Sequence, residues 1–370
     1  MIMSISKGRE GQRFICLLGD ILIHDRLDPK SDGVVHLLNA AGLVLGNFET
    51  TLATSRTRPA AKRFNLWAKY SVVGELKRMR MAAVALANNH AMDFDFEGLF
   101  ETIEVLNADG IASAGAGHNL TEALKPAILG LEGLKVAFLA CSCQPTGHSI
   151  ATADRPGLAP LRVNVSLDIN AREQQEWIGK LPSIKMDPDE EDLNRLVETL
   201  RSVKDEVDVA VVSIHWGQSW QPMVFDYQVQ VAHTLIDNGA DIIMGHGPHV
   251  LHGIEAYNKR IIFYSLGHFI YHTSQPGHVR GLASLPDSGL KRASAEPYRW
   301  RFHETAIGKI VLDGSQIKHA EIIPVMLDQN GNPVVAEGES CTSILHYLSV
   351  ISRYLGTSIV MRENKGLITA

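Results

Sequence analysis

Short apolar runs that end abruptly in polar residues recur along this chain and constrain its fold more than any other feature. The clearest is residues 241–250, DIIMGHGPHV, in which residues 242–244 suit a buried strand. The glycines and the proline that follow cannot continue a strand, so we expect His246 and His249 to lie on an irregular loop. Loops at the carboxyl ends of strands are where α/β proteins bind ligands.

The same design occurs in four other stretches. Apolar runs at residues 14–18, 42–46, 81–87 and 208–214 are followed by Asp20, by Glu49, by Asn89 and His90, and by His215. Taken singly, an aspartate after a strand is often only a turn residue or a helix cap. The Asn-rich turn that contains Asn89 could likewise only cap the helix that follows. Their shared position at strand ends favours one site. Asp93 lies three residues after His90, within reach of a carboxylate–imidazole pair.

Imidazole, carboxylate and amide groups without cysteine at these positions favour Mn, Fe or Zn in a two-metal site over a structural zinc. Two adjacent cations need an anion between them, and Glu49 is well placed to bridge them. The four cysteines lack the spacing of a zinc ribbon or a redox pair. We expect them to be buried small hydrophobes.

Composition limits the class of protein. With 370 residues and 45% hydrophobic content, the chain can bury one large core, so we predict a single domain over residues 1–370. Lys and Arg total 35 against 41 Asp and Glu, and no long basic tract occurs, which argues against nucleic acid as a partner. The polar start and the lack of about 18 uninterrupted apolar residues predict no transmembrane segment and a cytoplasmic location.

The carboxyl-terminal third has a different pattern. Residues 270–304 lose periodicity and are rich in Gly, Pro, Ser and basic residues, which predicts a long loop or lid. This insert could hold an anionic substrate or be a mobile surface segment. Residues 306–312 and 319–325 are typical of an antiparallel pair, and a helix is expected at about 340–354, so that 305–370 completes the domain.

The motif series GD, GNFE, NNHAMD, HWG, GHGPHV and YSLGHF, within residues 19–269, resembles the poly-γ-glutamate capsule-synthesis (CapA-type) family. This resemblance implies a calcineurin-like metallophosphoesterase fold, a sandwich of two mixed β-sheets flanked by helices with a dinuclear metal centre. Carried over by motif, the metal set is Asp20, Glu49, Asn89, His215, His246 and His249. His90 would be the acid–base partner, and Asp93 would orient it.

Four features depart from the metallophosphoesterase pattern. One is the closing Gly-His-x-His motif, which here reads His246-Gly-Pro-His249. Leu22 stands where a histidine usually follows the first aspartate, and Glu49 stands where the bridging residue is usually aspartate. His268 stands where the last motif usually has asparagine. His268 could add a ligand or alter substrate choice.

The leading hypothesis is a metal-dependent hydrolase acting on a phosphoester or a related anionic small molecule, with two divalent metal ions as cofactors. One alternative is an amide-bond-forming or γ-glutamyl ligase acting on a polyglutamate-like substrate, although no nucleotide-binding loop is visible. A third is a non-enzymatic partner in capsule assembly. The sequence makes no prediction of the oligomeric state.

Overall fold

The computed structural model describes residues 13–54, 57–62, 65–168, 176, 183–272, 279–280 and 301–369. The strands are β1 (Phe14–Leu22), β2 (Leu43–Phe48), β3 (Thr51–Leu52), β4 (Asn65–Ala68), β5 (Met81–Ala85), β6 (Ala112–Ala114), β7 (Ala116–Gly117), β8 (Ala127–Leu131), β9 (Leu134–Ser142), β10 (Gly157–Leu158), β11 (Val163–Asp168), β12 (Ser183–Pro188), β13 (Val209–His215), β14 (Ile242–His246), β15 (Ile254–Tyr257), β16 (Arg260–Phe263), β17 (His268–Tyr271), β18 (Val279–Arg280), β19 (Glu304–Asp313), β20 (Gln316–Leu327), β21 (Pro333–Val335), β22 (Ser358–Arg362) and β23 (Lys365–Thr369). The helices are α1 (Asp32–Asn39), α2 (Val73–Arg78), α3 (Asp95–Ala108), α4 (Leu120–Leu124), α6 (Glu190–Lys204), α7 (Asp226–Asp237) and α8 (Gly338–Arg353), with single 3-10 turns at η1 (Pro29–Ser31) and η2 (Tyr70–Val72).

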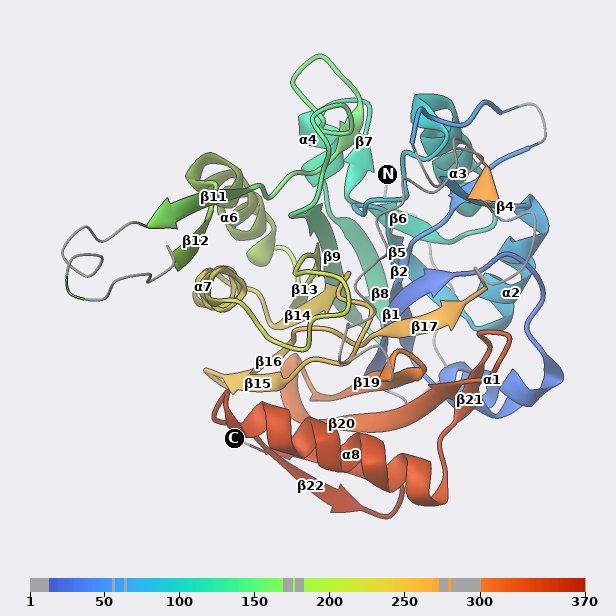
Figure 1. Ribbon diagram of the computed structural model, residues 1–370, viewed down its shortest axis with the longest axis vertical. Coiled ribbons are helices and arrows are strands. Elements are labelled where there is room, and N and C mark those ends of the chain that lie inside the picture. Colours follow the sequence, from blue (N-terminus) through green and yellow to red (C-terminus); the bar gives the residue numbers. More distant parts are fainter. Residues whose placement is uncertain are drawn as a thin grey trace.

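Two mixed sheets form the centre of the molecule (Figure 1). The larger has the order β22-β23-β20-β19-β1-β2-β5-β6, with β17 beside β1 and β21 beside β20. The smaller has the order β15-β16-β14-β13-β9-β8. Within them, β1, β2, β5 and β6 run parallel, as do β9, β13, β14 and β16. The predicted sandwich of two mixed sheets flanked by helices is confirmed.

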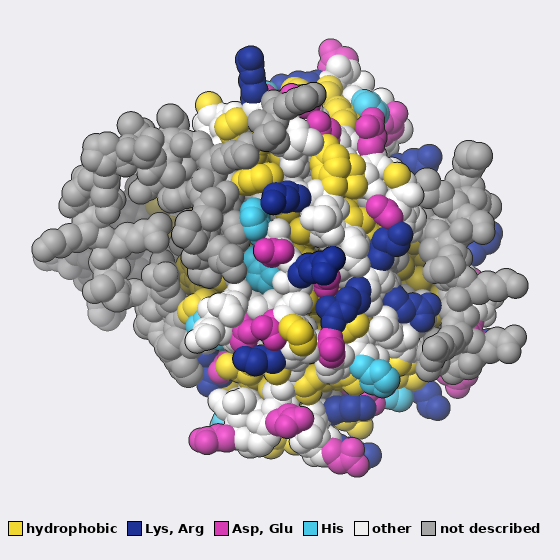
Figure 2. Space-filling view, turned by 90° about the vertical axis from the view of Figure 1, so that its right-hand side faces the viewer, with side chains coloured by type: hydrophobic (Ala, Val, Ile, Leu, Met, Phe, Trp, Pro, Cys, Tyr) yellow, Lys and Arg dark blue, Asp and Glu magenta, His cyan; other side chains and the backbone are white. Residues whose placement is uncertain are grey.

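The core lies between the sheets because both contribute apolar side chains to their facing surfaces. Leu45 of β2 and Ile310 of β19 belong to the same buried cluster as Phe138 of β9 and Val211 of β13. Helices α1, α2 and α3 flank the larger sheet, and α6 and α7 flank the smaller (Figure 1). The face with α1 to α3 mixes basic and acidic side chains (Figure 2). This mixture agrees with the lack of a basic tract in the sequence.

The carboxyl-terminal prediction is confirmed in its main elements. Strands β19 and β20 form the expected antiparallel pair, and α8 covers the expected helix. The sequence did not predict β22 and β23, which extend the larger sheet to its edge. Of the predicted 270–304 loop, residues 273–278 and 281–300 lie outside the described part, while Val279–Arg280 pairs with β4. Among described residues, no helix is long and apolar enough to cross a membrane.

Several strands run further than the sequence predicted, and β1 and β14 do so at glycines. Strand β1 continues through Asp20 to Leu22, with irregular pairing around Asp20, and β14 includes His246. The reason is that the glycines in these strands make room for neighbouring backbone. A Cβ at Gly19 would lie 1.9 Å from the carbonyl oxygen of Gly267, and one at Gly245 would lie 2.4 Å from that of Tyr264.

Gly19→Ala should therefore destabilise the fold by about 3 kcal/mol, the upper end of overpacking costs, because the atom it meets is backbone and cannot rotate away. The measurement is the free energy of unfolding from urea titration. Gly74→Ala is the matched control. A Cβ at Gly74 meets nothing within 4 Å, and alanine favours its helix α2, so stability should hold or rise slightly. Equal stability of both variants would contradict this account of Gly19.

Candidate metal centre

Asp20 is the fully buried carboxylate at the junction of the two sheets. Its Oδ1 accepts a hydrogen bond of 2.8 Å from Nδ2 of Asn47, its register partner on β2. Its Oδ2 lies 2.9 Å from Nδ1 of His249 and accepts a bond of 3.3 Å from the backbone N–H of Gly247. Parallel pairing places β1 and β2 with their carboxyl ends at the same edge, so the polar residues after each strand converge.

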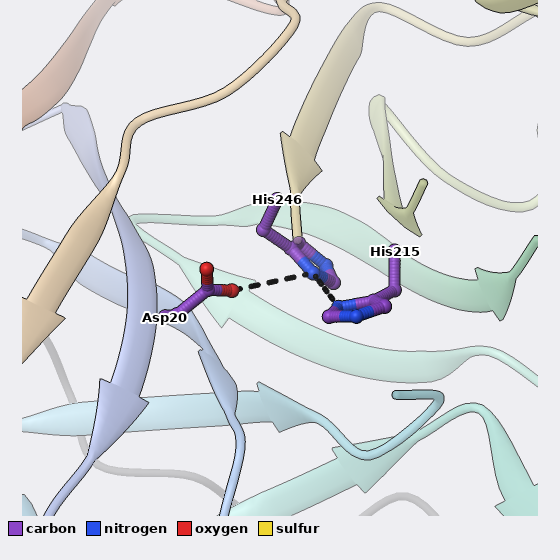
Figure 3. A group of neighbouring side chains, drawn as sticks. All are labelled: Asp20, His215 and His246. Carbon is purple, nitrogen blue, oxygen red and sulfur yellow. Dashed lines mark hydrogen bonds and ion pairs between the residues drawn. The ribbon is translucent and has the colours of Figure 1, made fainter. Parts of the chain in front are cut away.

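His215 and His246 approach Asp20 from the smaller sheet (Figure 3). They are the last residues of β13 and β14 and are paired in register. Their Nδ1 atoms are 2.9 Å apart, and Nδ1 of His246 lies 3.7 Å from Oδ1 of Asp20. Nε2 of His246 is 2.7 Å from the hydroxyl of Ser213, which fixes the ring. Strand register alone therefore juxtaposes two imidazoles that are 31 residues apart.

His249 and His268 form a second group with Asp20. Strand β17 pairs parallel with β1 so that His268 is in register with Asp20, and its ring stacks on His249 at 4.3 Å and 7°. Within each group, Asp20–His215–His246 and Asp20–His249–His268, the potential ligand atoms lie within 4.8 Å of one another. Asp20 is thus common to both. His268 supplies an imidazole beside Asp20, where Leu22 offers none.

Glu49 lies beside these two groups. In the part of the chain that the structure describes, it is a member of neither group. It is fully buried, with Oε1 3.9 Å from Nε2 of His249 and Oε2 3.5 Å from Nδ2 of Asn47. Burial and the charge of Asp20 raise the pKa of Glu49 well above its usual value. Burial would also raise the pKa of Asp20, but the hydrogen bond and charge of His249 hold it well below the usual range. Without a cation, the two carboxyls favour one ionised and one neutral group.

The buried imidazoles are held in the neutral form that binds metal. Burial lowers the pKa of His246 to about 4. It also lowers the pKa of His215 and of His268 well below the ordinary value, and neighbouring histidines, His90 among them, lower both further. These rings can therefore act as neutral nitrogen ligands at neutral pH.

Several buried polar atoms of the predicted site residues and of His268 have no hydrogen-bond partner among the described residues. They are Oε1 of Glu49, Oδ1 of Asn89, Nε2 of His215 and Nδ1 of His268. Each comes from a residue type that ligates Mn, Fe or Zn, and unpaired polar atoms in a protein interior are costly. A divalent cation at each group would use lone pairs that the protein leaves unused and would let both carboxyls ionise. The donor set fits two metals.

His90 and Asp93 lie beside this centre as the predicted pair. Nδ1 of His90 is 2.7 Å from Oδ2 of Asp93, which also accepts a 2.6 Å bond from the backbone N–H of Leu66. Lys62 forms an ion pair with the other oxygen of Asp93 and donates a 2.6 Å bond to the carbonyl of Asn89. The carboxylate is thereby fixed from three sides.

A chain of amide side chains links His90 to Asp20. The backbone N–H of His90 donates to Oδ1 of Asn88 at 3.0 Å, and Nδ2 of Asn88 donates to Oδ1 of Asn47 at 3.0 Å. Asn47 in turn donates to Asp20. Neither Asn88 nor Lys62 was assigned a role from the sequence. The doubled asparagine was a signal for Asn88, whereas nothing in the pattern around residue 62 marks that lysine.

The sequence profile of the family described as bacterial capsule synthesis protein PGA_cap matches residues 15–273. The chain belongs to this family. The CapA-type resemblance drawn from the motifs is confirmed, and the matched span includes both candidate metal groups.

The relatives of this PGA_cap chain differ in how much of their length it covers. The PGA biosynthesis protein CapA of Bacillus subtilis (strain 168) is 30% identical over 237 residues, 64% of this chain and 54% of that protein. The uncharacterized protein y4sH of Sinorhizobium fredii is 27% identical over 429 residues, 95% of this chain and 92% of that protein.

Two solved structures show distant likenesses to this PGA_cap chain. A hypothetical protein from Thermus thermophilus has 12% identity and a TM-score of 0.46, covering 84% of this chain and 98% of that one. The Haemophilus influenzae NAD nucleotidase (NadN) has 12% identity and a TM-score of 0.40, covering 90% and 62%. Such low identities concern the general fold alone.

The two groups predict a graded loss of metal. Wild-type protein should bind about two equivalents of Mn, Fe or Zn, as expected of a two-metal site. Asp20→Asn should lose both because both groups share Asp20, and His268→Gln should lose about one. Elemental analysis after gel filtration measures this. His319→Gln, outside both groups, is the control. Full metal content in Asp20→Asn would contradict the shared role.

The bridging role of Glu49 remains a prediction, and charge removal tests it. Glu49→Gln keeps the shape and one oxygen donor but removes the negative charge, so occupancy at both sites should fall if Glu49 lies between the cations. Glu49→Asp keeps the charge and should be milder. Isothermal titration with Mn²⁺ gives the stoichiometry and affinity. Unchanged Mn²⁺ binding in Glu49→Gln would contradict the bridging role of Glu49. Asp20 would then remain the carboxylate that the two groups share.

Proposed function

We propose that this PGA_cap protein is a metal-dependent hydrolase of a phosphoester or related anionic substrate, acting in capsule (PGA) biosynthesis. The observation that carries the proposal is a pair of His/Asp groups sharing Asp20, with the hydrogen-bonded pair His90 and Asp93 beside them. The biosynthetic setting is suggested by the family description and by the printed name of the Bacillus subtilis relative. A cytoplasmic location is part of the same proposal.

The metal-holding residues would be the predicted set of Asp20, Glu49, Asn89, His215, His246 and His249, with His268 added by the geometry. Divalent cations, when bound, supply Lewis acidity that stabilises charge on a phosphoryl group and makes a water more acidic. The protein's part is to hold neutral imidazoles and buried carboxylates in fixed positions. The hydrogen bonds through Asn47 and Asn88 do this by tying the strand ends to one another.

His90 is the residue that would give a proton to the leaving group. Its Nδ1 faces Oδ2 of Asp93, so the Nδ1–H is donated to that carboxylate and Nε2 is left for the substrate. Asp93 holds the ring orientation, and Lys62 with the N–H of Leu66 holds Asp93. This division of labour makes His90 the acid and Asp93 the group that orients it.

Hydrolysis and ligation are separated by one assay series. Purified protein with Mn²⁺ should release phosphate from model phosphoesters and should form no amide from glutamate plus ATP. Glutamate-dependent consumption of ATP, with phosphoesters left intact, would instead support the ligase alternative. Loss of all turnover in Asp20→Asn, with the variant still folded by circular dichroism, would argue against a purely structural role in capsule assembly.

His90→Asn should keep the metal content near wild type while lowering kcat by roughly 10² to 10⁴, the usual contribution of a positioned acid–base group. The loss should be larger for an alkyl phosphate than for 4-nitrophenyl phosphate because the good leaving group needs less protonation. Steady-state kinetics with both esters, together with elemental analysis, measures this.

Asp93→Asn should show the same order of substrates with a smaller loss, since it removes only the partner of His90. Metal lost from His90→Asn would make His90 a ligand. Equal losses for both esters would exclude its role as the acid.

A further inference from the structure

Aromatic side chains line one side of the second candidate metal group, Asp20–His249–His268. Trp220 has its ring centroid 5.5 Å from His249 and 5.6 Å from His268. Phe302 meets Trp220 at 6.0 Å edge-on and Tyr271 at 6.1 Å, and Tyr271 lies 4.4 Å from His268. We call Trp220, Tyr271 and Phe302 the aromatic wall. All three residues are partly exposed.

The backbone holds Trp220 in a conformation that large side chains rarely adopt. Its φ is 66°, and His249 beside it has φ 63°. The N–H of Trp220 donates a 2.7 Å bond to the carbonyl of Pro248, within the segment that carries His246 and His249. The carbonyl of Gln221 lies 2.7 Å from Nε2 of the buried His252. Strained residues of this kind persist where surrounding contacts fix them, and they cluster at functional sites.

Trp220 is partly exposed, and its indole makes no flat stacking contact with another described ring. The ring contacts of Trp220 with described residues are tilted or perpendicular, at 51°, 57° and 85°, so no described ring stacks flat on it. A substrate that places its anionic group at His249 and His268 would bring its adjoining atoms against this indole. Planar aromatic groups gain most from such a surface because they stack on it.

We infer that the aromatic wall binds an aromatic ring attached to the scissile phosphate, so that the substrate class is an aryl or nucleoside phosphoester rather than an aliphatic polyanion. The inference rests on the proposed function, since it names the substrate of the same centre. Trp220 is the platform for the ring, and Phe302 and Tyr271 keep the indole in place from its edge and through His268.

Phosphonates test the aromatic site without turnover, because their carbon–phosphorus bond resists hydrolysis. Phenylphosphonate and methylphosphonate carry the same anionic group, so the ratio of their dissociation constants isolates the ring. For Mn²⁺-loaded wild type, calorimetry should give a ratio of about ten in favour of the phenyl compound, equivalent to about 1.4 kcal/mol. A ratio near one would overturn the inference.

Variants assign that ratio to one side chain. Trp220→Leu keeps apolar bulk without a ring and should bring the ratio toward one, whereas Trp220→Phe should keep most of it. Tyr354→Ala removes an aromatic ring that is 88% exposed and outside the wall, and should leave the ratio unchanged. Metal content and the unfolding midpoint are measured for each variant. A ratio retained in Trp220→Leu would show that Trp220 is not the platform.

Hydrolysis assays separate this inference from the proposed function and identify the ring. Phenyl phosphate and adenosine 5′-monophosphate are compared with glycerol 3-phosphate, and the aromatic ester whose kcat/KM falls more in Trp220→Leu identifies an aryl or a nucleoside ring. If phenylphosphonate binds more tightly than methylphosphonate but no ester is hydrolysed, the proposed hydrolase activity is contradicted and the aromatic site is supported. Equal kcat/KM for all three esters, with a phosphonate ratio of one, would contradict the aromatic site and leave the hydrolase standing.

Discussion

The burial of the Asp20 carboxylate is the constraint on which the rest of the structure depends. Removing a charge from water costs several kcal/mol, so it persists only where enough donors surround it. Here Asn47 on β2 of the larger sheet and Gly247 and His249 in the turn after β14 of the smaller sheet supply them, from two separate segments. Because these segments belong to both sheets, the same contacts that solvate the anion also hold the sandwich together at its functional edge.

Hydrogen bonding among buried side chains defines the geometry of the candidate centre. Asn47 and Asn88 connect Asp20 to the backbone of His90, while Ser213 orients His246. The side chains of Asn47, Asn88 and Ser213 are all buried. Asp20 and His90 are thus joined by one chain of hydrogen-bonded amides, which holds the candidate metal groups and the pair His90 and Asp93 in fixed positions.

Close backbone approach and local strain are the cost of bringing so many groups to one edge. The backbone at Gly19 lies against the carbonyl of Gly267, and the backbone at Gly247 lies against the imidazole of His215. Neither position has room for a side chain. Trp220 and His249 occupy left-handed backbone conformations that the surrounding packing imposes. A centre built in this way tolerates little substitution at its glycines, although these residues offer no chemistry themselves.

The sequence by itself determined the apolar strands and the polar residues at their ends, because burial patterns and turn residues are local properties, whereas the two-sheet class came from the resemblance of its motifs to the capsule-synthesis family. It also indicated that Asp20, His215, His246 and His249 belong to one site, since each follows an apolar run that suits a strand. Only the tertiary structure decided that Asp20 is shared by two groups and that His268 joins one of them, because register between β1 and β17 links positions 248 residues apart. The same holds for Lys62 and Trp220. Their roles depend on long-range contacts across the fold, and such contacts produce no periodic pattern in the sequence.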